Sequence, residues 1–304
     1  MEKKKAINVL LVIIPILVII ACVMAYLYFT KMKVEETTSN EPIFTLQNYP
    51  RIDGSTATLP LAQAFKAGFT GKNIEETEVT HSKTHNAYVN LINGDTDLIL
   101  VTYPSEDEQK LAQEKNVELE IVPIVKEAFV FFVNKENQID NLSLEQIKQI
   151  YSGKITNWKE VGGPDAKITA YQRPANSGSQ SGMLELVMKN TKIMEAPKEN
   201  IASGMADIID VISDYNNKDT AIGYSYYYYA TKMYTSDTIK LLSIDGVKPT
   251  YDNIKEGLYN IQTAYYAVIR KSETEDSPAR KLLNAMKSSN GQNIAKEAGY
   301  VQNY

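Results

Sequence analysis

The sequence predicts an α/β fold with two lobes. Apolar runs that resemble buried strands alternate with amphipathic helical patterns, and small polar loops separate them. This alternation is typical of α/β chains with largely parallel sheets. Two of the apolar runs, 128–133 and 264–270, each end in polar residues that lead into a new segment. Lying side by side, they would form a two-stranded crossover hinge, with 43–130 plus 264–304 as lobe 1 and 131–263 as lobe 2.

Three helical patterns follow loops that are rich in serine and threonine. The first begins at Leu59, directly after the loop 53–58. The second is THNAYVNLING, where Gly94 is the expected C-cap because glycine readily adopts the left-handed conformation that ends many helices. The third, MLELVMK, begins at Met183 after YQRPANSGSQSG (171–182). Each loop therefore stands at the start of a predicted helix.

Shorter sequence patterns predict the remaining strands and helices. The runs 97–101 (DLILV) and 221–224 (AIGY) have the apolar character of buried strands. The sequence SLEQ at 143–146 is a capping box, which predicts that a helix starts there. A C-terminal helix is expected to open at Pro278 and to end near Gly291.

The N-terminal segment predicts a membrane anchor. Residues 6–29 form an apolar run without a charge. At about 1.5 Å per helical residue, this run covers the roughly 30 Å hydrocarbon core of a bilayer. Lys3, Lys4 and Lys5 precede it, and the positive-inside bias then places the N-terminus in the cytoplasm and the rest of the chain outside. We therefore expect residues 1–30 to be an uncleaved transmembrane anchor.

A lipoprotein signal is the alternative interpretation of the same segment. The sequence IIAC at 19–22 resembles a bacterial lipobox, whose cysteine, here Cys22, is lipidated after cleavage. The apolar run continues past Cys22, whereas a mature lipoprotein usually starts with polar residues, so the anchor is preferred. Both interpretations place the rest of the chain at the extracytoplasmic face of a bacterial cell membrane, with 31–42 as a polar linker.

Composition excludes several classes of site. The formal net charge is −5, and an acidic chain is a poor candidate for nucleic-acid binding. Cys22 is the only cysteine, so neither an intramolecular disulfide nor a thiolate metal cluster can form. His81 and His85 have the i, i+4 spacing of a helical metal pair, but no third ligand stands at recognisable spacing. We expect neither a metal nor a cofactor.

The three Ser/Thr loops together indicate an anion site. A helix N-terminus exposes unpaired N–H groups and the positive end of the helix dipole, and both stabilise an anion. Taken singly, hydroxyls at these positions are ordinary N-caps; they belong to Ser55, Thr56, Thr58, Thr84 and Ser177. Arg173, beside the third loop, adds a planar fork of donors that fits phosphate or carboxylate oxygens. We expect a ligand in the cleft between the lobes.

A longer segment has a familiar pattern. The residues YSGKITNWKEVGGPDAKITAYQRPANSGSQ (151–180) resemble the hallmark stretch of the phosphate-binding proteins of the phosphate-specific ABC transporter. In that family an SGKI, NW and GG pattern precedes an arginine and an SGT-type loop. Other segments support the same resemblance, namely 53–61, 95–108 and 219–230. The similarity covers 43–304, and its most specific part is 151–180.

The resemblance implies a type II periplasmic-binding-protein fold, in which two α/β lobes close on a ligand. It implies a membrane-tethered, extracytoplasmic solute-binding protein that captures inorganic phosphate for the permease of an ABC importer. Such a protein makes and breaks no bond, so no enzyme activity is expected. The alternative is a sensor of an oxyanion or a phosphorylated ligand, with the same fold but no part in transport. A serine hydrolase is disfavoured because SGSQSG is not a G-x-S-x-G elbow.

The resemblance also implies the ligand-binding residues. They are Ser55, Thr56, Thr58, Leu59, Thr84, Thr102, Arg173, Ser177, Gly178 and Ser179. Thr102 stands where the family commonly has an aspartate, whose carboxylate accepts the proton of phosphate and repels sulfate. Ala175 occupies a position that is often acidic and pairs with the arginine. Both departures leave the preferred oxyanion open. Lys83 and His85 are candidates to add positive charge near the second loop, but exposure at the surface is the preferred interpretation.

Overall fold

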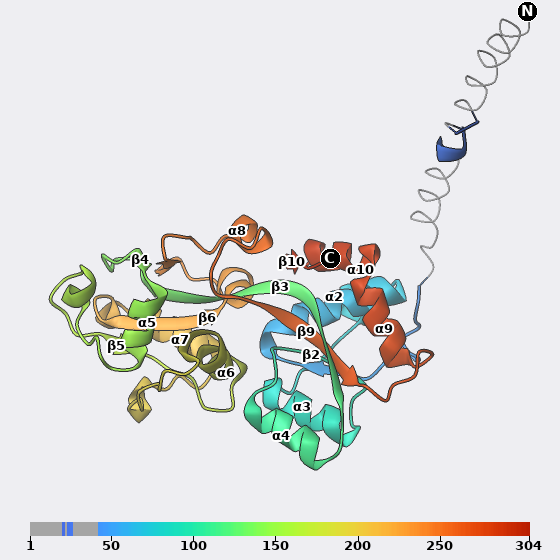
Figure 1. Ribbon diagram of the computed structural model, residues 1–304, viewed down its shortest axis with the longest axis horizontal. Coiled ribbons are helices and arrows are strands. Elements are labelled where there is room, and N and C mark those ends of the chain that lie inside the picture. The colour runs from blue at the N-terminus through green and yellow to red at the C-terminus, as the bar shows by residue number, and fades with distance from the viewer. Residues whose placement is uncertain (1–19, 22, 27–41) are drawn as a thin grey trace, which may run out of the picture. The chain divides into compact units, whose positions relative to one another are not determined.

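The structure is a computed structural model that describes residues 20–21, 23–26 and 42–304 (Figure 1). The chain divides into two compact units, 1–43 and 44–304. In the first unit, the described residues before position 27 are helical and exposed. The second unit contains the α/β structure in which the candidate site lies.

The segment expected to be a membrane anchor or lipoprotein signal, 1–30, falls largely outside the described residues. Cys22 and most of the 31–42 linker fall outside them too. Within the part of the chain that the structure does describe, every helix is too short or too polar to cross a bilayer. The anchor and its lipidated alternative therefore stay predictions.

The second unit is built on a mixed sheet. Its strands are β1 Ile52–Gly54, β2 Leu98–Val101, β3 Leu119–Asn134, β4 Asn141–Leu142, β5 Thr169–Ala170, β6 Ala221–Tyr226, β7 Ile239–Leu241, β8 Ser243–Ile244, β9 Gln262–Arg270 and β10 Val301–Gln302. The main sheet has eight strands in the order β1-β2-β9-β3-β6-β5, with β7 and β10 also paired to β3. A separate pair contains β4 and β8. The strands expected from the apolar runs are confirmed.

The long strand β3 joins two groups of elements (Figure 1). Its first half pairs with β9, from Leu119 opposite Arg270 to Ala128 opposite Gln262, and its second half pairs with β6 and β7. The chain runs along β3 in one direction and along β9 in the other, so this central pair is antiparallel. Within the described residues, five of the eight strand pairs are antiparallel. The expectation of largely parallel sheets is therefore wrong.

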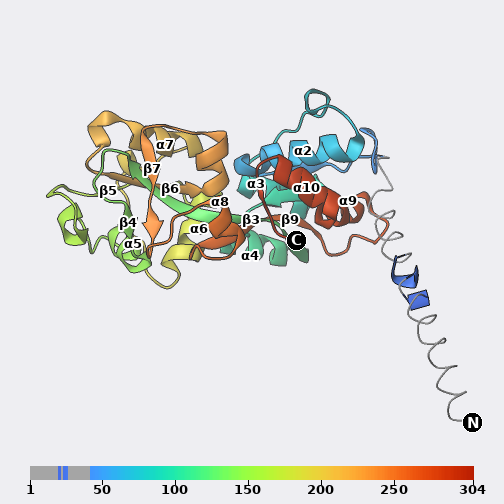
Figure 2. The ribbon, with the colours of Figure 1, turned by 90° about the horizontal axis from the view of Figure 1, so that it is seen from above.

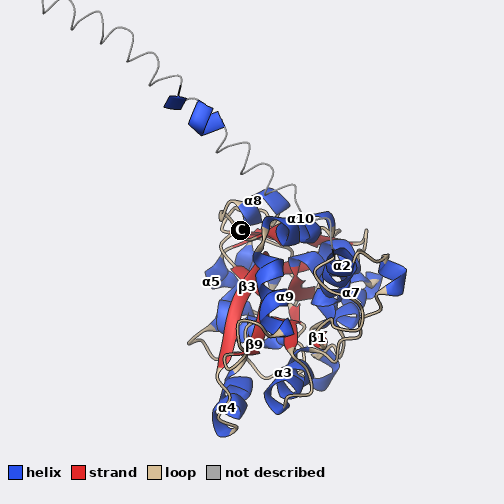
Figure 3. Ribbon diagram, turned by 90° about the vertical axis from the view of Figure 1, so that its right-hand side faces the viewer, coloured by secondary structure: helices blue, strands red, loops and turns tan. Residues whose placement is uncertain are grey.

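Helices surround the strands of this unit (Figure 3). They are α2 Leu59–Thr70, α3 Thr84–Asn93, α4 Glu106–Glu114, α5 Leu144–Tyr151, α6 Gly178–Gly182, α7 Met205–Ser213, α8 Tyr251–Lys255, α9 Pro278–Lys287 and α10 Ser289–Glu297. Short 3-10 turns are η1 Thr56–Thr58, η2 Ile74–Glu76, η3 Trp158–Val161, η5 Lys198–Asn200 and η6 Tyr215–Asn217, and π-helical segments are η4 Met183–Met188 and η7 Tyr229–Met233. Seen from above, α2, α3, α4, α9 and α10 lie in one group and α5, α6 and α7 in the other (Figure 2).

Local signals account for several helix ends. The Ser143 hydroxyl accepts a hydrogen bond from the Gln146 amide at 3.1 Å, which confirms the capping box at the start of α5. Gly94 ends α3 with a φ of 84°, as expected of a glycine C-cap. Both features depend only on neighbouring residues, which is why the sequence predicts them.

Two helix boundaries differ from expectation. The third loop's helix begins at Gly178 rather than Met183, because Ser177 caps it by accepting the Gln180 amide at 3.1 Å. At the C-terminus Gly291 does not end a helix. The Ser288 hydroxyl accepts the Gly291 amide at 3.2 Å and starts a new helix, α10. In both cases a serine N-cap determines the boundary.

Glu127 is a buried carboxyl in the middle of β3. Only 1% of the residue is exposed, and its Oε1 accepts hydrogen bonds from the Ala128 amide at 2.8 Å and the Tyr228 amide at 3.3 Å. Burial raises the pKa of Glu127 from an ordinary value of 4.5 to about 8. In the folded protein the group therefore keeps its proton at pH values where the unfolded chain has lost it.

Replacing Glu127 with glutamine, which cannot ionise, is expected to remove a pH dependence of stability. The native state binds the extra proton, so this group's contribution is complete below its unfolded pKa and is lost as pH rises towards about 8. The free energy of unfolding falls by up to about 1.4 kcal/mol per pH unit between the two pKa values. Urea unfolding near the acidic and the basic end of this range measures the effect. A constant difference between wild type and Glu127→Gln at both pH values would contradict it.

Candidate functional site

The first Ser/Thr loop follows β1 and forms the turn that leads into α2. Strand β2 shapes this loop, because the Ser55 amide donates to the Leu100 carbonyl at 2.9 Å and the Thr58 hydroxyl donates to the same carbonyl at 2.6 Å. The Thr58 hydroxyl also lies 3.0 Å from the Ser55 carbonyl, and the residue is fully buried. Thr58 therefore holds the loop in shape and has no hydroxyl hydrogen left for a ligand.

A buried carboxylate and a histidine hold the second loop against the first. Asp53 accepts hydrogen bonds from the Ser82 amide at 2.7 Å and the Asn90 side chain at 2.8 Å. Burial alone would raise the pKa of Asp53, but these hydrogen bonds lower it overall. His81 Nδ1 lies 2.8 Å from the Ser55 carbonyl, and burial lowers the pKa of this imidazole. The two loops are thus positioned together before a ligand arrives.

The two histidines do not form a metal pair. His81 precedes α3, which begins at Thr84, so it shares no helix face with His85. The His85 Nδ1 atom instead lies 2.9 Å from Glu108 Oε1. The described ranges contain no group of three or more His, Cys, Asp or Glu residues that could hold a metal ion.

The third loop is fixed by the start of α6 and by strand β6. The Arg173 amide donates to the Tyr224 hydroxyl at 3.0 Å, and the Gln180 side-chain oxygen lies 3.1 Å from the same amide. The Tyr224 hydroxyl in turn donates to Gln180. The Tyr226 hydroxyl donates to the Gly178 carbonyl at 2.9 Å. The backbone on both sides of the loop is therefore ordered.

The second and third loops meet at Gly178. A Cβ atom built at this position would lie 2.6 Å from Thr84 Oγ1 and 3.0 Å from Thr102 Oγ1. Carbon and oxygen atoms in van der Waals contact are farther apart than this, so any side chain at Gly178 would push the two loops apart. Glycine thus lets the start of α6 approach hydroxyls from α3 and from the end of β2.

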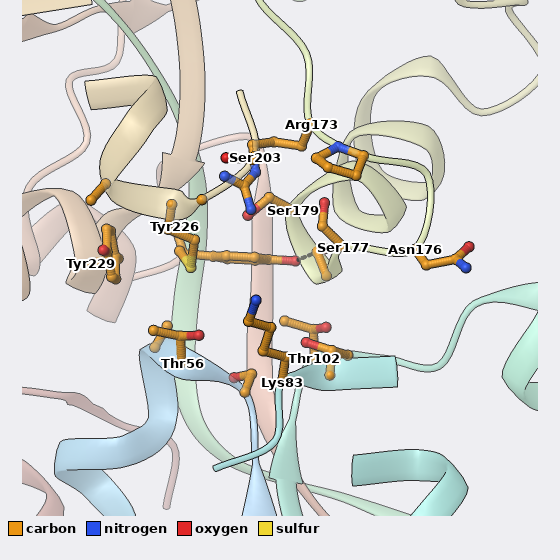
Figure 4. Close-up of a pocket in the computed structure, with 18 residues that line it drawn as sticks. Thr56, Lys83, Thr102, Arg173, Asn176, Ser177, Ser179, Ser203, Tyr226 and Tyr229 are labelled. Atoms are coloured by element: carbon orange, nitrogen blue, oxygen red, sulfur yellow. Dashed lines mark hydrogen bonds between the residues drawn. The ribbon is translucent and has the colours of Figure 1, made fainter. Parts of the chain in front are cut away.

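The three loops line one cavity of about 430 Å³, a size typical of small-molecule sites (Figure 4). Arg173, Ser177 and Ser179 lie on one side of it, with Thr56 and Thr102 opposite. The expected ligand residues that line it are Ser55, Thr56, Thr84, Thr102, Arg173, Ser177, Gly178 and Ser179. Thr58 and Leu59 do not, because the Thr58 hydroxyl is bonded to β2 and Leu59 begins α2.

Arg173 is buried without partners for its side chain. It is 6% exposed, and its Nε and Nη1 atoms make no hydrogen bond within the described part of the chain. Burial lowers the pKa of Arg173, yet a guanidinium remains charged at neutral pH. The carboxylate that acts on it electrostatically is Asp207, which accepts the Ser203 hydroxyl at 2.5 Å and the Gly204 amide at 2.7 Å. A negatively charged ligand with acceptor oxygens would compensate both the charge and these donors.

The Thr102 hydroxyl is also buried at the cavity wall. The residue is 4% exposed and lines the cavity, and within the described ranges its Oγ1 has the Tyr226 hydroxyl as a neighbour but no hydrogen bond of full geometry. Buried hydroxyls are nearly always paired, so this one has capacity for a ligand oxygen.

Sequence reasoning missed part of the lining. The additional residues are Ala57, Lys83, Pro174, Asn176, Ser203, Gly204, Met205, Ala206, Tyr226 and Tyr229. Ser203 and Gly204 stand directly before α7, so the SG dipeptide ahead of the apolar IIDVI pattern was a usable signal, of the same kind as the other three loops. The two tyrosines carried no signal, because aromatic residues in a strand-like run predict core packing.

Comparison with known proteins agrees with this architecture. The family model described as the PBP superfamily domain matches residues 39–285. The phosphate-binding protein PstS of Bacillus subtilis (strain 168) is 34% identical over 172 residues, which is 56% of this chain and 53% of that protein. PstS of Borreliella burgdorferi is 30% identical over 179 residues, or 58% of this chain and 63% of that protein. The aligned regions thus span less than two thirds of either relative.

A solved structure covers more of the chain. The Clostridium perfringens protein regarded as the substrate-binding protein of a phosphate ABC transporter, solved with bound phosphate, has a TM-score of 0.63 and 26% identity. The likeness covers 83% of this chain and 98% of that one. The family-model match extends over most of the chain, and the mixed α/β fold agrees with the solved structure. The chain therefore belongs to the PBP superfamily.

Proposed function

We propose that the protein captures inorganic phosphate in this cavity and delivers it to the permease of an ABC importer. The observation that carries the proposal is Arg173, a buried guanidinium with unpartnered N–H groups at the cavity wall. Hydroxyls from three loops surround the same space. Phosphate offers negative charge and several acceptor oxygens, which match this set of donors. The names of the relatives, all phosphate-binding proteins, support the same ligand.

We propose that the ligand is held by hydroxyls and N–H groups from each of the three loops. On this proposal the first loop contributes Ser55 and Thr56, the second contributes Thr84, and Thr102 lies beside it. Arg173 contributes charge, and the remaining donors come from Ser177, Gly178 and Ser179 at the N-terminus of α6. Thr58 and Leu59, expected to bind the ligand directly, are proposed to shape the first loop instead.

Binding is proposed to close two lobes about β3 and β9. One lobe would be 43–130 plus 264–304, and the other 131–263. In support, the first two loops precede β3 in sequence and the third lies between β3 and β9, yet all of them line the same cavity. Closure would bring the loops together on the ligand without a chemical step. Binding and release, rather than catalysis, are the whole of the proposed activity.

The N-terminal segment 1–30 is proposed to hold this body at the extracytoplasmic face of a bacterial membrane. The charge-free run 6–29 and the lysines before it support an uncleaved anchor. The intact mass of the protein extracted from membranes distinguishes the two forms. A chain that starts at Met1 supports the anchor, whereas a chain that starts at a lipid-modified Cys22 supports the lipoprotein.

The proposed function is tested by calorimetric titration of phosphate into the protein after unfolding and refolding to remove any carried ligand. Saturable heat with one phosphate per chain is expected near neutral pH. No heat at any phosphate concentration would overturn the assignment. Recovery of a permease with the protein from detergent-solubilised membranes tests delivery. Phosphate binding without any associated permease would favour a sensor over a transport component.

A further inference from the structure

Lys83 has a backbone conformation that lysine rarely adopts. Its φ is 76° and its ψ is 162°, a region populated almost only by glycine. The residue is the N-cap of α3, and its side chain makes no cap hydrogen bond. Residues held in such regions lower stability, and they persist where the surrounding structure or function requires them. The strain therefore raises the question of what the Lys83 side chain contributes.

The side chain is directed into the cavity. Lys83 lines the cavity, and Figure 4 shows its ammonium group extending from the Thr56 and Thr102 side towards the side that carries Arg173. The described residues give its Nζ atom neither an ion pair nor a hydrogen bond. Lys83 and Arg173 are therefore two cations that approach one space from opposite walls.

Among the residues that the structure describes, no carboxylate lines this cavity. Thr102, at the cavity wall, offers only a neutral hydroxyl. Asp207 acts electrostatically on Arg173 but does not itself line the cavity, and its carboxylate accepts hydrogen bonds from Ser203 and Gly204, which do. The site thus presents two positive charges and no group that repels a fully ionised anion.

We propose that Lys83 is a second cationic ligand and that the site selects doubly charged tetrahedral oxyanions regardless of whether they carry a proton. This inference rests on the proposed oxyanion-binding function and specifies its ligand class. The monohydrogen phosphate dianion and sulfate then bind alike, whereas singly charged dihydrogen phosphate binds more weakly. Two cations match two negative charges. The two cations repel each other when the cavity is empty, and a bound anion offsets that repulsion.

Two carboxyl groups that act on the cavity residue Tyr226 change charge near neutral pH, because burial raises the pKa of Glu185 to about 7 and that of Glu127 to about 8. Other groups around the cavity keep their charge. Hydrogen bonds from Ser203 and Gly204 lower the pKa of Asp207, so it stays ionised. Burial raises the pKa of the tyrosines that face Arg173 or the cavity, so they stay neutral; they are Tyr224, Tyr226 and Tyr229. On the second loop, His81 contacts the Ser55 carbonyl and its pKa is lowered by burial, and His85 contacts Glu108. Sulfate, whose charge is constant, reports any residual change in the protein.

The first test compares phosphate and sulfate by calorimetry on the full chain at about pH 5.5 and about pH 8, on either side of the second ionisation of phosphate. Sulfate affinity should change by less than about threefold, while phosphate affinity should fall about tenfold per pH unit once the dianion becomes the minor form. Phosphate binding without sulfate binding, or phosphate affinity that is unchanged at the lower pH, would overturn the inference. Binding of neither anion at the higher pH would instead overturn the proposed function itself.

The second test replaces Lys83 with glycine and uses Lys189→Gly as a matched control. Both lysines have a positive φ, but Lys189, with a φ of 49°, does not line the cavity. Lys83→Gly should raise the thermal midpoint of the ligand-free protein and weaken phosphate and sulfate by about tenfold or more. Lys189→Gly should raise the midpoint and leave both affinities unchanged. Unchanged affinities in Lys83→Gly would show that the lysine is not a ligand.

Discussion

Replacing Arg173 with methionine is expected to weaken phosphate binding by about thirtyfold or more, because truncating one partner of a buried charge pair costs about 2–5 kcal/mol. The same change is expected to stabilise the ligand-free protein. Arg173 is 6% exposed and leaves Nε and Nη1 without partners, and each such buried donor costs about 1–3 kcal/mol. Methionine fills a similar length of space without a charge or a donor. Titration calorimetry and urea unfolding of the same preparations measure the two effects.

Arg280→Met is the matched control. The Arg280 side chain is 12% exposed, but its Nη1 pairs with Glu120 at 2.7 Å. Removing this arginine leaves a carboxylate without its partner, so Arg280→Met should lower stability and leave phosphate affinity unchanged. The two variants therefore move stability in opposite directions. Retained affinity in Arg173→Met would exclude the arginine as a ligand, and a loss of stability would mean that its donors are satisfied without phosphate.

The sequence predicts the elements of this fold better than their pairing. Helices α2, α3 and α5 follow from apolar spacing, a capping box and a glycine C-cap, all of which depend on residues close together in the chain. Strand direction depends on contacts between distant segments, such as β3 with β9, and a local pattern does not contain that information. The expectation of largely parallel sheets assumed that each helix returns the chain to a parallel neighbour. The long strand β3 instead pairs antiparallel with β6, β7 and β9.

The sequence also predicts part of the candidate site, because some of the signals for the site lie between residues close together in the chain. Serine and threonine before a helix are visible in the sequence, and most of the residues expected on that basis line the cavity. Thr58 is an exception because its hydroxyl bonds to Leu100, a strand away, and no spacing rule predicts such a contact. Lys83 is exposed, as expected, but it also lines the cavity. Its positive φ and its direction into the cavity result from how α3 begins against Asp53 and Ser82, which only the folded chain determines.

Replacing Thr102 with aspartate is expected to weaken sulfate binding by about a hundredfold or more, since placing like charges together costs several kcal/mol. Phosphate should lose much less, because its remaining proton can be donated to the new carboxylate. The geometry suits such a contact: Thr102 is 4% exposed, its hydroxyl is unpartnered, and it lies at the cavity wall beside Gly178. Competition titrations of the two anions near neutral pH measure the change in selectivity. The gain should persist across the neutral range, because monohydrogen phosphate keeps its one remaining proton there and can still donate it to the carboxylate.

Thr102→Asn separates charge from shape. Asparagine closely matches the size of aspartate but carries no charge, so it should alter the affinities of sulfate and phosphate by similar factors. If the aspartate and asparagine variants weaken sulfate equally, the effect is steric and Thr102 does not determine selectivity. If only the aspartate variant excludes sulfate, the neutral hydroxyl at position 102 is what admits fully ionised anions. Lys83 and Arg173 then face a ligand whose charge, and not its proton, determines how tightly it is held.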